Sequence, residues 1–129
     1  MSTFKWQVCV NSPYTRIPCN RGVYNIGLSS LVMFNVPKDF DNSILYVCIH
    51  PYVEGGSIYL DQGGRFINSI KAVVNTFDTV LKLTFSKDEI TFHKIDLSGD
   101  LFNLSVLNTQ GDNVLSAGYA IFQLLPYNE

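Results

Sequence analysis

The sequence predicts an all-β fold, an antiparallel β-sandwich of about eight strands, and three observations support this prediction. Apolar and polar residues alternate along several short segments, as they do in strands with one buried face. Turn-forming residues separate those segments at short intervals. The chain has 129 residues, the length of one domain, without a linker or an internal repeat. We therefore expect residues 1–129 to form a single sandwich domain, and the strand number also allows a jelly roll.

The alternation is clearest at the N-terminus, where "TFKWQVCV" (3–10) predicts the first strand, with Phe4, Trp6, Val8 and Val10 on one face. The following stretch, 11–28, contains Pro13, Pro18, Gly22 and Gly27 and is expected to form a loop. Two further strands are expected at 31–36 and 44–50, because Pro37 and the turn residues "KDFDNS" separate them.

Residues 51–78 do not show one clear period. Four apolar residues recur there at helical spacing: Phe66, Ile70, Val73 and Phe77. The same segment is rich in Val, Ile, Thr and Asn, which favour strands and turns over helices. We expect either a short helix near 65–77 or an irregular strand.

Two hairpins are expected in the C-terminal half. In "TVLKLTFSKDEITFHKI", pairing Phe85 with Ile90 across "SKDE" places Leu83 opposite Phe92 and Lys82 opposite His93. The apolar residues then share one face and the polar residues the other, which specifies the register. In the second hairpin, residues 102–106 face residues 115–121 across the turn "NTQGDN".

The charge content excludes several function classes. Charged residues make up 16% of the chain and the net charge is −2, whereas soluble domains carry about 25% charged residues. There is no basic stripe for nucleic acid and no apolar run long enough for a membrane span. A surface so poor in charge is typical of a protein that neighbouring molecules partly cover.

Cellular location is indicated by the cysteines and the N-terminus. Three cysteines without a short spacing argue against a secreted disulfide framework. The N-terminal residues lack the basic region and apolar run of a signal peptide. We therefore expect synthesis in the cytoplasm.

Cys48 and His50 are the residues that most resemble a chemical site. On a strand they point to the same side, so both could reach one metal ion. A zinc site needs two more ligands, and the candidates are Cys9, Cys19 and His93. A single C-x-H match is weak evidence, and the apolar neighbours of Cys48 are typical of a buried, inert thiol. We therefore expect no metal and no cofactor.

Catalysis is not indicated either. A Cys–His nucleophile pair needs a third group that orients the base and a pocket that excludes water, and no G-x-S-x-G turn is present. The pairs Gly55-Gly56 and Gly63-Gly64 lack the strand–glycine–helix context of a phosphate-binding loop and are expected to form turns. We expect a protein that is not an enzyme.

The strands at 31–36 and 44–49 are apolar on both faces, whereas a simple sandwich has one polar face toward water. Either residues 51–78 fold back over the outer apolar face or another subunit covers it. The low charge favours the subunit. The candidate interface consists of Val32, Phe34, Val36, Leu45, Val47 and Ile49.

Aromatic residues in the connecting segments are a second candidate for binding: Tyr14, Tyr24, Tyr52 and Tyr59. They are mixed with asparagines and glycine pairs. Tyr with Asn suits stacking on sugar rings, and the same composition suits protein–protein contacts. Both interpretations stay open at this point.

In overall character the chain resembles the small β-sandwich structural proteins of tailed bacteriophage particles, such as decoration, head-fibre, tail and baseplate components. The resemblance rests on the short alternating strands ("TFKWQVCV", "TVLKLTF", "EITFHKI"), the Asn/Tyr-rich loops, the low charge and the missing signal peptide. It implies a structural role in a virion, as a homo-oligomer that packs on neighbouring capsid or tail proteins. The alternative is a carbohydrate- or receptor-binding module that uses the tyrosine loops.

Overall fold

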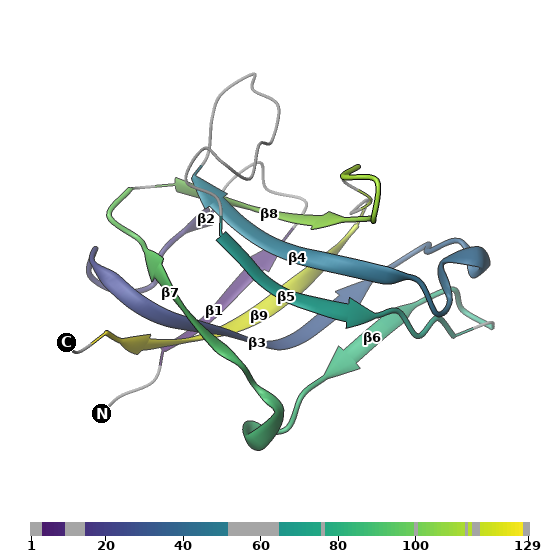
Figure 1. The fold of residues 1–129 in the computed structure, drawn as a ribbon, viewed down its shortest axis with the longest axis horizontal. Helices are drawn as coiled ribbons and strands as arrows, with labels where there is room; N and C mark the ends of the chain where they lie inside the picture. Colours follow the sequence, from purple (N-terminus) through teal and green to yellow (C-terminus); the bar gives the residue numbers. More distant parts are fainter. Residues whose placement is uncertain are drawn as a thin grey trace.

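A computed structural model describes residues 4–9, 15–51, 65–75, 77–99, 101–112, 114 and 117–127. These residues form two antiparallel sheets that pack face to face, so the prediction of an all-β sandwich is confirmed (Figure 1). Sheet A contains β1 (Phe4–Cys9), β9 (Gly118–Pro126), β3 (Val23–Met33), β6 (Leu81–Thr84) and β7 (Phe92–Asp96). Sheet B contains, in order, β2 (Thr15–Arg16), β8 (Leu101–Leu107), β4 (Ile44–Pro51) and β5 (Arg65–Lys71). Two short 3-10 turns, η1 (Lys38–Phe40) and η2 (Lys87–Glu89), complete the described elements.

The strand order within the described residues is that of a jelly roll. Strands β6 and β7 both pair with the same long strand, β3, so they act as one interrupted strand. β1 pairs with β9, and β2 with β8. Nested inside these pairs, β3 pairs with β6 and β7, and β4 pairs with β5. A double-sheet fold with this nested pairing is the jelly-roll architecture.

The core lies between the sheets, and Trp6 connects them. Its ring packs edge-on against Phe102 of sheet B, with centroids 5.8 Å apart, and also lies 6.2 Å from the ring of Phe122. The indole Nε1 donates a hydrogen bond of 3.0 Å to the carbonyl oxygen of Arg16 on β2. The expected inward face of the first strand is confirmed, since Trp6 and Val8 are buried and Phe4 packs against the core.

The expected loop at 11–28 is wrong over most of its described part. Strand β2 lies within it, and β3 begins at Val23. The turn-forming residues in this stretch alternate with Tyr24, Ile26 and Leu28, which are buried. Polar and small residues therefore occupy the alternate positions of a strand. The preference of such residues for turns led to the expectation of a loop.

Neither expected hairpin forms. Strands β6 and β7 pair with successive parts of β3, so His93 lies opposite Ile26 rather than Lys82. Strand β8 pairs with β2 and β4, whereas β9 pairs with β1 and β3 in the other sheet. Alternation shows which residues share a face, but it does not choose between a neighbour in sequence and a distant strand.

Of the two alternatives expected near 65–77, the irregular strand is confirmed and the short helix is wrong. Residues Arg65–Lys71 form the edge strand β5, which pairs with β4 through a bulge at Val47 and Cys48. Beyond the strand, Val73 and Phe77 are exposed while Ile70 is buried. The helical spacing of these apolar residues therefore does not correspond to one buried face. Residues 51–78 were one of the two covers expected for the outer apolar face, and 52–64 of them lie outside the described residues.

Candidate functional site

The six residues of the expected interface do not form one exposed face. Leu45, Val47 and Ile49 point into the core from β4, which lies between β8 and β5. Val32 and Val36 are also buried within the chain, and Phe34 alone of the six is exposed. The expectation is corrected in this respect, because a strand that is apolar on both sides does not reveal which side faces the core.

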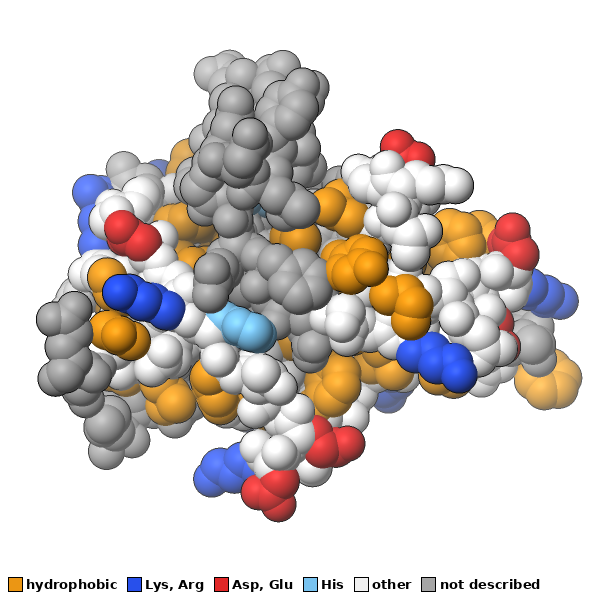
Figure 2. Space-filling view, viewed as in Figure 1, with side chains coloured by type: hydrophobic (Ala, Val, Ile, Leu, Met, Phe, Trp, Pro, Cys, Tyr) orange, Lys and Arg blue, Asp and Glu red, His pale blue; other side chains and the backbone are white. Residues whose placement is uncertain are grey.

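Exposed apolar residues gather instead at one end of the sandwich, which we call the apolar end. Its members are Phe34 (42% exposed), Ile44 (42%), Val73 (58%) and Phe77 (98%). Among the described residues, Val23 is the one other large apolar side chain classed as exposed, and it starts β3 at the opposite end. Figure 2 shows hydrophobic side chains at the right-hand limit of the molecule.

Backbone connections place the four residues together. Ile44 begins β4 and lies opposite Lys71, the last residue of β5, with Val73 two residues further on. Phe34 follows the end of β3, and two residues later the Val36 N–H donates a 2.9 Å hydrogen bond to Thr79 O. This bond joins the end of β3 to the turn that carries Phe77.

The turn at Phe77 is held by its own hydrogen bonds. Asn75 Oδ1 accepts the Phe77 N–H at 2.9 Å, and Asn75 O accepts the Thr79 N–H at 2.9 Å. Asp78 Oδ1 accepts the Val80 N–H at 3.1 Å, and the Asn75 N–H donates to Val80 O at 3.0 Å. Side-chain acceptors of this kind stabilise tight turns, and Phe77 stands almost fully exposed beside these hydrogen bonds.

Cys48 and His50 lie on the outer face of sheet B, as the strand period predicts, and both are buried. Their register partners on β8 are Ser105 and Asn103. Burial raises the pKa of the Cys48 thiol to about 11, although the neighbouring Ser105 acts in the opposite direction. Its Sγ is 4.0 Å from the Tyr46 carbonyl oxygen. A neutral, desolvated thiol is a poor nucleophile and a poor metal ligand.

The other candidate zinc ligands are not gathered around Cys48. His93 lies in sheet A opposite Ile26, and Cys19 is a half-buried residue between β2 and β3. The side chain of Cys9 is outside the described residues. Over the described part of the chain, no three His, Cys, Asp or Glu side chains come together in a way that could hold a metal ion.

The tyrosine loops are largely outside the described residues, which exclude Tyr14, Tyr52 and Tyr59. Tyr24 is described and is buried on β3, and its hydroxyl donates a hydrogen bond to the carbonyl oxygen of Asn20. A hydrogen bond with Cys19 and burial together raise the pKa of Tyr24 to about 12. Tyr24 is therefore a structural residue whose ring is not available for stacking on a ligand.

Two clefts among the described residues are further candidate sites. One, of about 330 Å³, lies between the η1 turn and the loop after β8 and is lined by Asp39, Phe40, Ser43, Asn108, Thr109 and Gln110. The other, of about 270 Å³, lies between β5 and the β6–η2 segment and is lined by Ser69, Ile70, Lys71, Leu83, Phe85 and Glu89. Both combine segments distant in sequence, so local patterns gave no signal for either.

Comparison of the chain with protein-family models, with curated protein sequences and with solved structures found no match. In the portion that the structure describes, no helix has the length and apolar character needed to cross a bilayer. The exposed residues and the clefts must therefore be interpreted from their own chemistry.

Proposed function

We propose that this chain is a non-enzymatic structural protein of a viral particle, of the bacteriophage kind. In this proposal the apolar end packs against further copies of the chain and against neighbouring capsid or tail proteins. The observation that supports it most strongly is Phe77, which is 98% exposed on a hydrogen-bonded turn. Groups of exposed apolar side chains, here Phe77 with Phe34, Ile44 and Val73, are characteristic of contact surfaces.

The energetics favour association through this end. Full burial of an exposed Val, Ile or Phe side chain contributes about 1.5–3 kcal/mol; Phe77 is almost fully exposed, whereas Phe34, Ile44 and Val73 each have about half of their area left to bury. Ordering flexible groups reduces the affinity of an interface, but the Phe77 turn is already ordered by hydrogen bonds to Asn75 and Asp78. An aromatic residue that becomes fully desolvated is a frequent interface hot spot.

The architecture is compatible with a particle role. Jelly rolls occur in viral capsid proteins and in lectins, although a fold alone does not determine a function. The low charge content, 16% of residues, supports extensive coverage by neighbours. The resemblance in strand pattern and loop composition to phage sandwich proteins supports the particle assignment further.

Sedimentation velocity over a wide concentration range tests the assembly. We expect the wild-type chain to form oligomers as its concentration rises, and Phe77→Ser to shift that transition at least tenfold upward. The matched control is Val23→Ser, which removes an exposed apolar residue from the opposite end and should sediment as wild type. A chain that stays monomeric throughout, or a Phe77→Ser variant that associates normally, would count against the proposal.

A second candidate function is carbohydrate or receptor binding, and the 330 Å³ cleft favours it. A carboxylate (Asp39), a carboxamide (Gln110) and an aromatic ring (Phe40) converge there, a combination that can hydrogen-bond and stack on a sugar. A glycan array tests this function. Specific binding that is lost in Asp39→Ala and Gln110→Ala but kept in Phe77→Ser would support it, and an array without signal would remove it.

A further inference from the structure

We propose that the groove between β5 and β6 accepts an extended segment of another protein, which adds as a strand to the edge of β5. The groove adjoins the apolar end at Lys71, which lies opposite Ile44, but it is lined by different residues. The segment is expected to carry alternating apolar side chains, an acidic residue beside Lys71 and a basic residue beside Glu89.

The groove arises because the chain diverges after a single bridge. Val74 and Leu81 pair as an isolated antiparallel bridge, and the strands on either side of it then enter different sheets. β5 pairs with β4 in sheet B, and β6 pairs with β3 in sheet A. The groove of about 270 Å³ is lined by residues of both strands, and β5 and β6 themselves are visible at the lower centre and right of Figure 1.

The wall formed by β5 presents main-chain groups suited to pairing. The Ala72 N–H donates to Ser43 O and the Asn42 N–H donates to Ala72 O, each at 2.8 Å, so Ala72 directs both groups toward β4. Along an antiparallel strand, the N–H and C=O groups of successive residues point alternately toward and away from the paired strand. The N–H and C=O groups of Ser69 and Lys71 therefore point away from β4. Within the described residues β5 has β4 as its one paired strand. Such an open edge is a template for an added strand.

The floor of the groove is apolar. Ile70 is buried, and Leu83 and Phe85 are half-buried against the core. Small-molecule pockets usually measure about 300–1,000 Å³, so this smaller groove is better matched to one or two side chains of an extended peptide. Because alternate residues of a strand point to one side, such a peptide can fill the groove with every second side chain.

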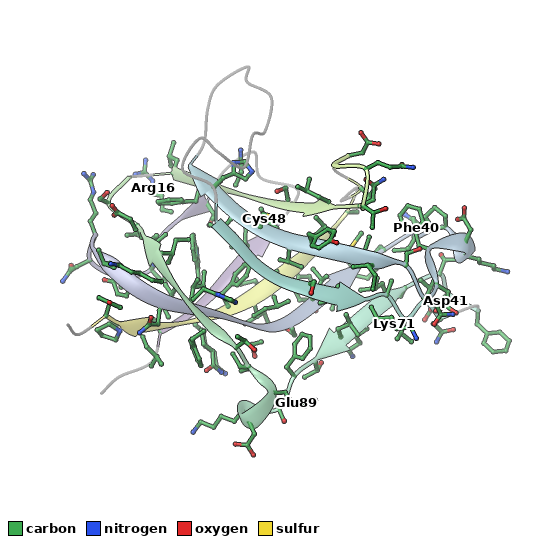
Figure 3. The ribbon with its side chains drawn as sticks, in the orientation of Figure 1. Arg16, Phe40, Asp41, Cys48, Lys71 and Glu89 are labelled. Carbon is green, nitrogen blue, oxygen red and sulfur yellow. The ribbon has the colours of Figure 1, made fainter. Side chains whose placement is uncertain are left out.

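Opposite charges stand on the two walls. Lys71 ends β5, and Glu89 belongs to η2 across the groove (Figure 3). The Glu89 carboxylate accepts hydrogen bonds from the Ser86 N–H at 2.9 Å and from Ser86 Oγ at 2.7 Å, and these bonds lower its pKa. An anionic wall facing a cationic wall favours a segment of complementary charge and fixes its direction.

The test begins with a random decapeptide display library selected on the full chain. The best peptide is synthesised and titrated onto ¹⁵N-labelled protein. We expect shifts at Ser69, Ile70, Lys71, Leu83 and Phe85. Amide exchange of Ser69 and Lys71 should slow at least tenfold on binding, while that of Ile70, which is already directed at β4, should change little.

A proline variant separates strand addition from simple groove filling. Because the Ser69 N–H is directed away from β4, Ser69→Pro should keep the β4 pairing yet remove a donor for the added strand. We expect it to weaken peptide binding at least tenfold, and Ser69→Ala to bind as wild type. Lys71→Glu should weaken binding and be rescued by a peptide with its acidic residue changed to lysine.

Peptide N-methylation provides a test that does not depend on the folding of any variant. Two peptides are compared, one N-methylated at its odd-numbered residues and the other at its even-numbered residues. Because only every second peptide N–H faces β5, one of these peptides should lose binding and the other should keep it. The proposal is overturned if no peptide is selected, or if the selected peptides shift residues of the 330 Å³ cleft or Phe34 and Phe77 of the apolar end instead of the groove residues. Equal binding of both methylated peptides would also overturn it.

Discussion

Gly27 on β3 lies directly opposite Phe92 on β7, and the Phe92 ring covers the space where a side chain at position 27 would stand. A Cβ atom there would be 3.1 Å from two carbons of the ring and 2.4 Å from Cγ2 of Ile90. The η2 turn that separates β6 from β7 precedes these two residues. Because position 27 has no side chain, Ile90 and Phe92 can pack closely against β3 at this edge of sheet A.

Replacement of this glycine is the first test of that packing. We expect Gly27→Ala to lower the free energy of unfolding by about 1–3 kcal/mol, the usual cost of overpacking a well-filled site. Urea denaturation measures the change. Ile90→Ala removes the clashing methyl group, so the double variant should recover part of the loss. If the losses of stability in the two single variants simply add in the double variant, contact with Ile90 is not the reason that Gly27→Ala is destabilising.

Trp6 is expected to hold the two sheets together. Trp6→Phe keeps a ring against Phe102 but removes the donor to the Arg16 carbonyl oxygen, which should cost about 1–3 kcal/mol. Thermal unfolding followed by circular dichroism measures this. Lys5→Ala, on the exposed neighbouring residue, serves as the control. Trp6 is the one tryptophan of the chain, so wild-type fluorescence should shift to longer wavelength as the core opens.

Cys48 should make the fold sensitive to alkaline pH. Its pKa is raised from 9.0 to about 11 in the folded chain, so the folded state keeps a proton that the unfolded state releases. Stability from this group is present below pH 9 and is lost as pH rises from about 9 to 11. Cys48→Ala should flatten the dependence of urea stability on pH in this window. An unchanged slope would show that the thiol is solvated.

Tyr24 gives a second alkaline effect at higher pH. Its folded pKa of about 12 exceeds the ordinary value of 10.0, so the phenol stays neutral in the fold while the unfolded chain ionises. Stability should therefore fall further between pH 10 and 12. Absorbance at 295 nm follows phenolate formation. The difference between wild type and Tyr24→Phe should show a midpoint near 12, and a midpoint near 10 would indicate an exposed hydroxyl.

The sequence predicted strand faces better than strand partners. Alternation correctly assigned the inward residues of β1 and correctly divided β4 into two sides, because the period of a strand is local. It did not show which side of β4 faces the core, and it paired β8 with β9 although they lie in different sheets. Those outcomes depend on long-range pairing, which is decided by the whole chain.

The candidate sites were less predictable than the fold. Phe77 was assigned to a possible helix face, although its turn is set by backbone N–H groups that donate hydrogen bonds to the Asn75 and Asp78 side chains, a signal that the local sequence does contain. The groove at Ile70, Leu83 and Phe85 requires knowledge that β5 and β6 enter different sheets. No local pattern carries that information.

Photo-crosslinking tests most directly whether the apolar end is the contact surface. A benzophenone amino acid is placed at position 77 in one sample and at position 23, the exposed apolar residue of the opposite end, in another. Irradiation at concentrations where the chain associates should give abundant dimers and higher oligomers from position 77 and few from position 23. Equal yields from both positions, or products from position 23 alone, would contradict assembly through Phe77 and its neighbours.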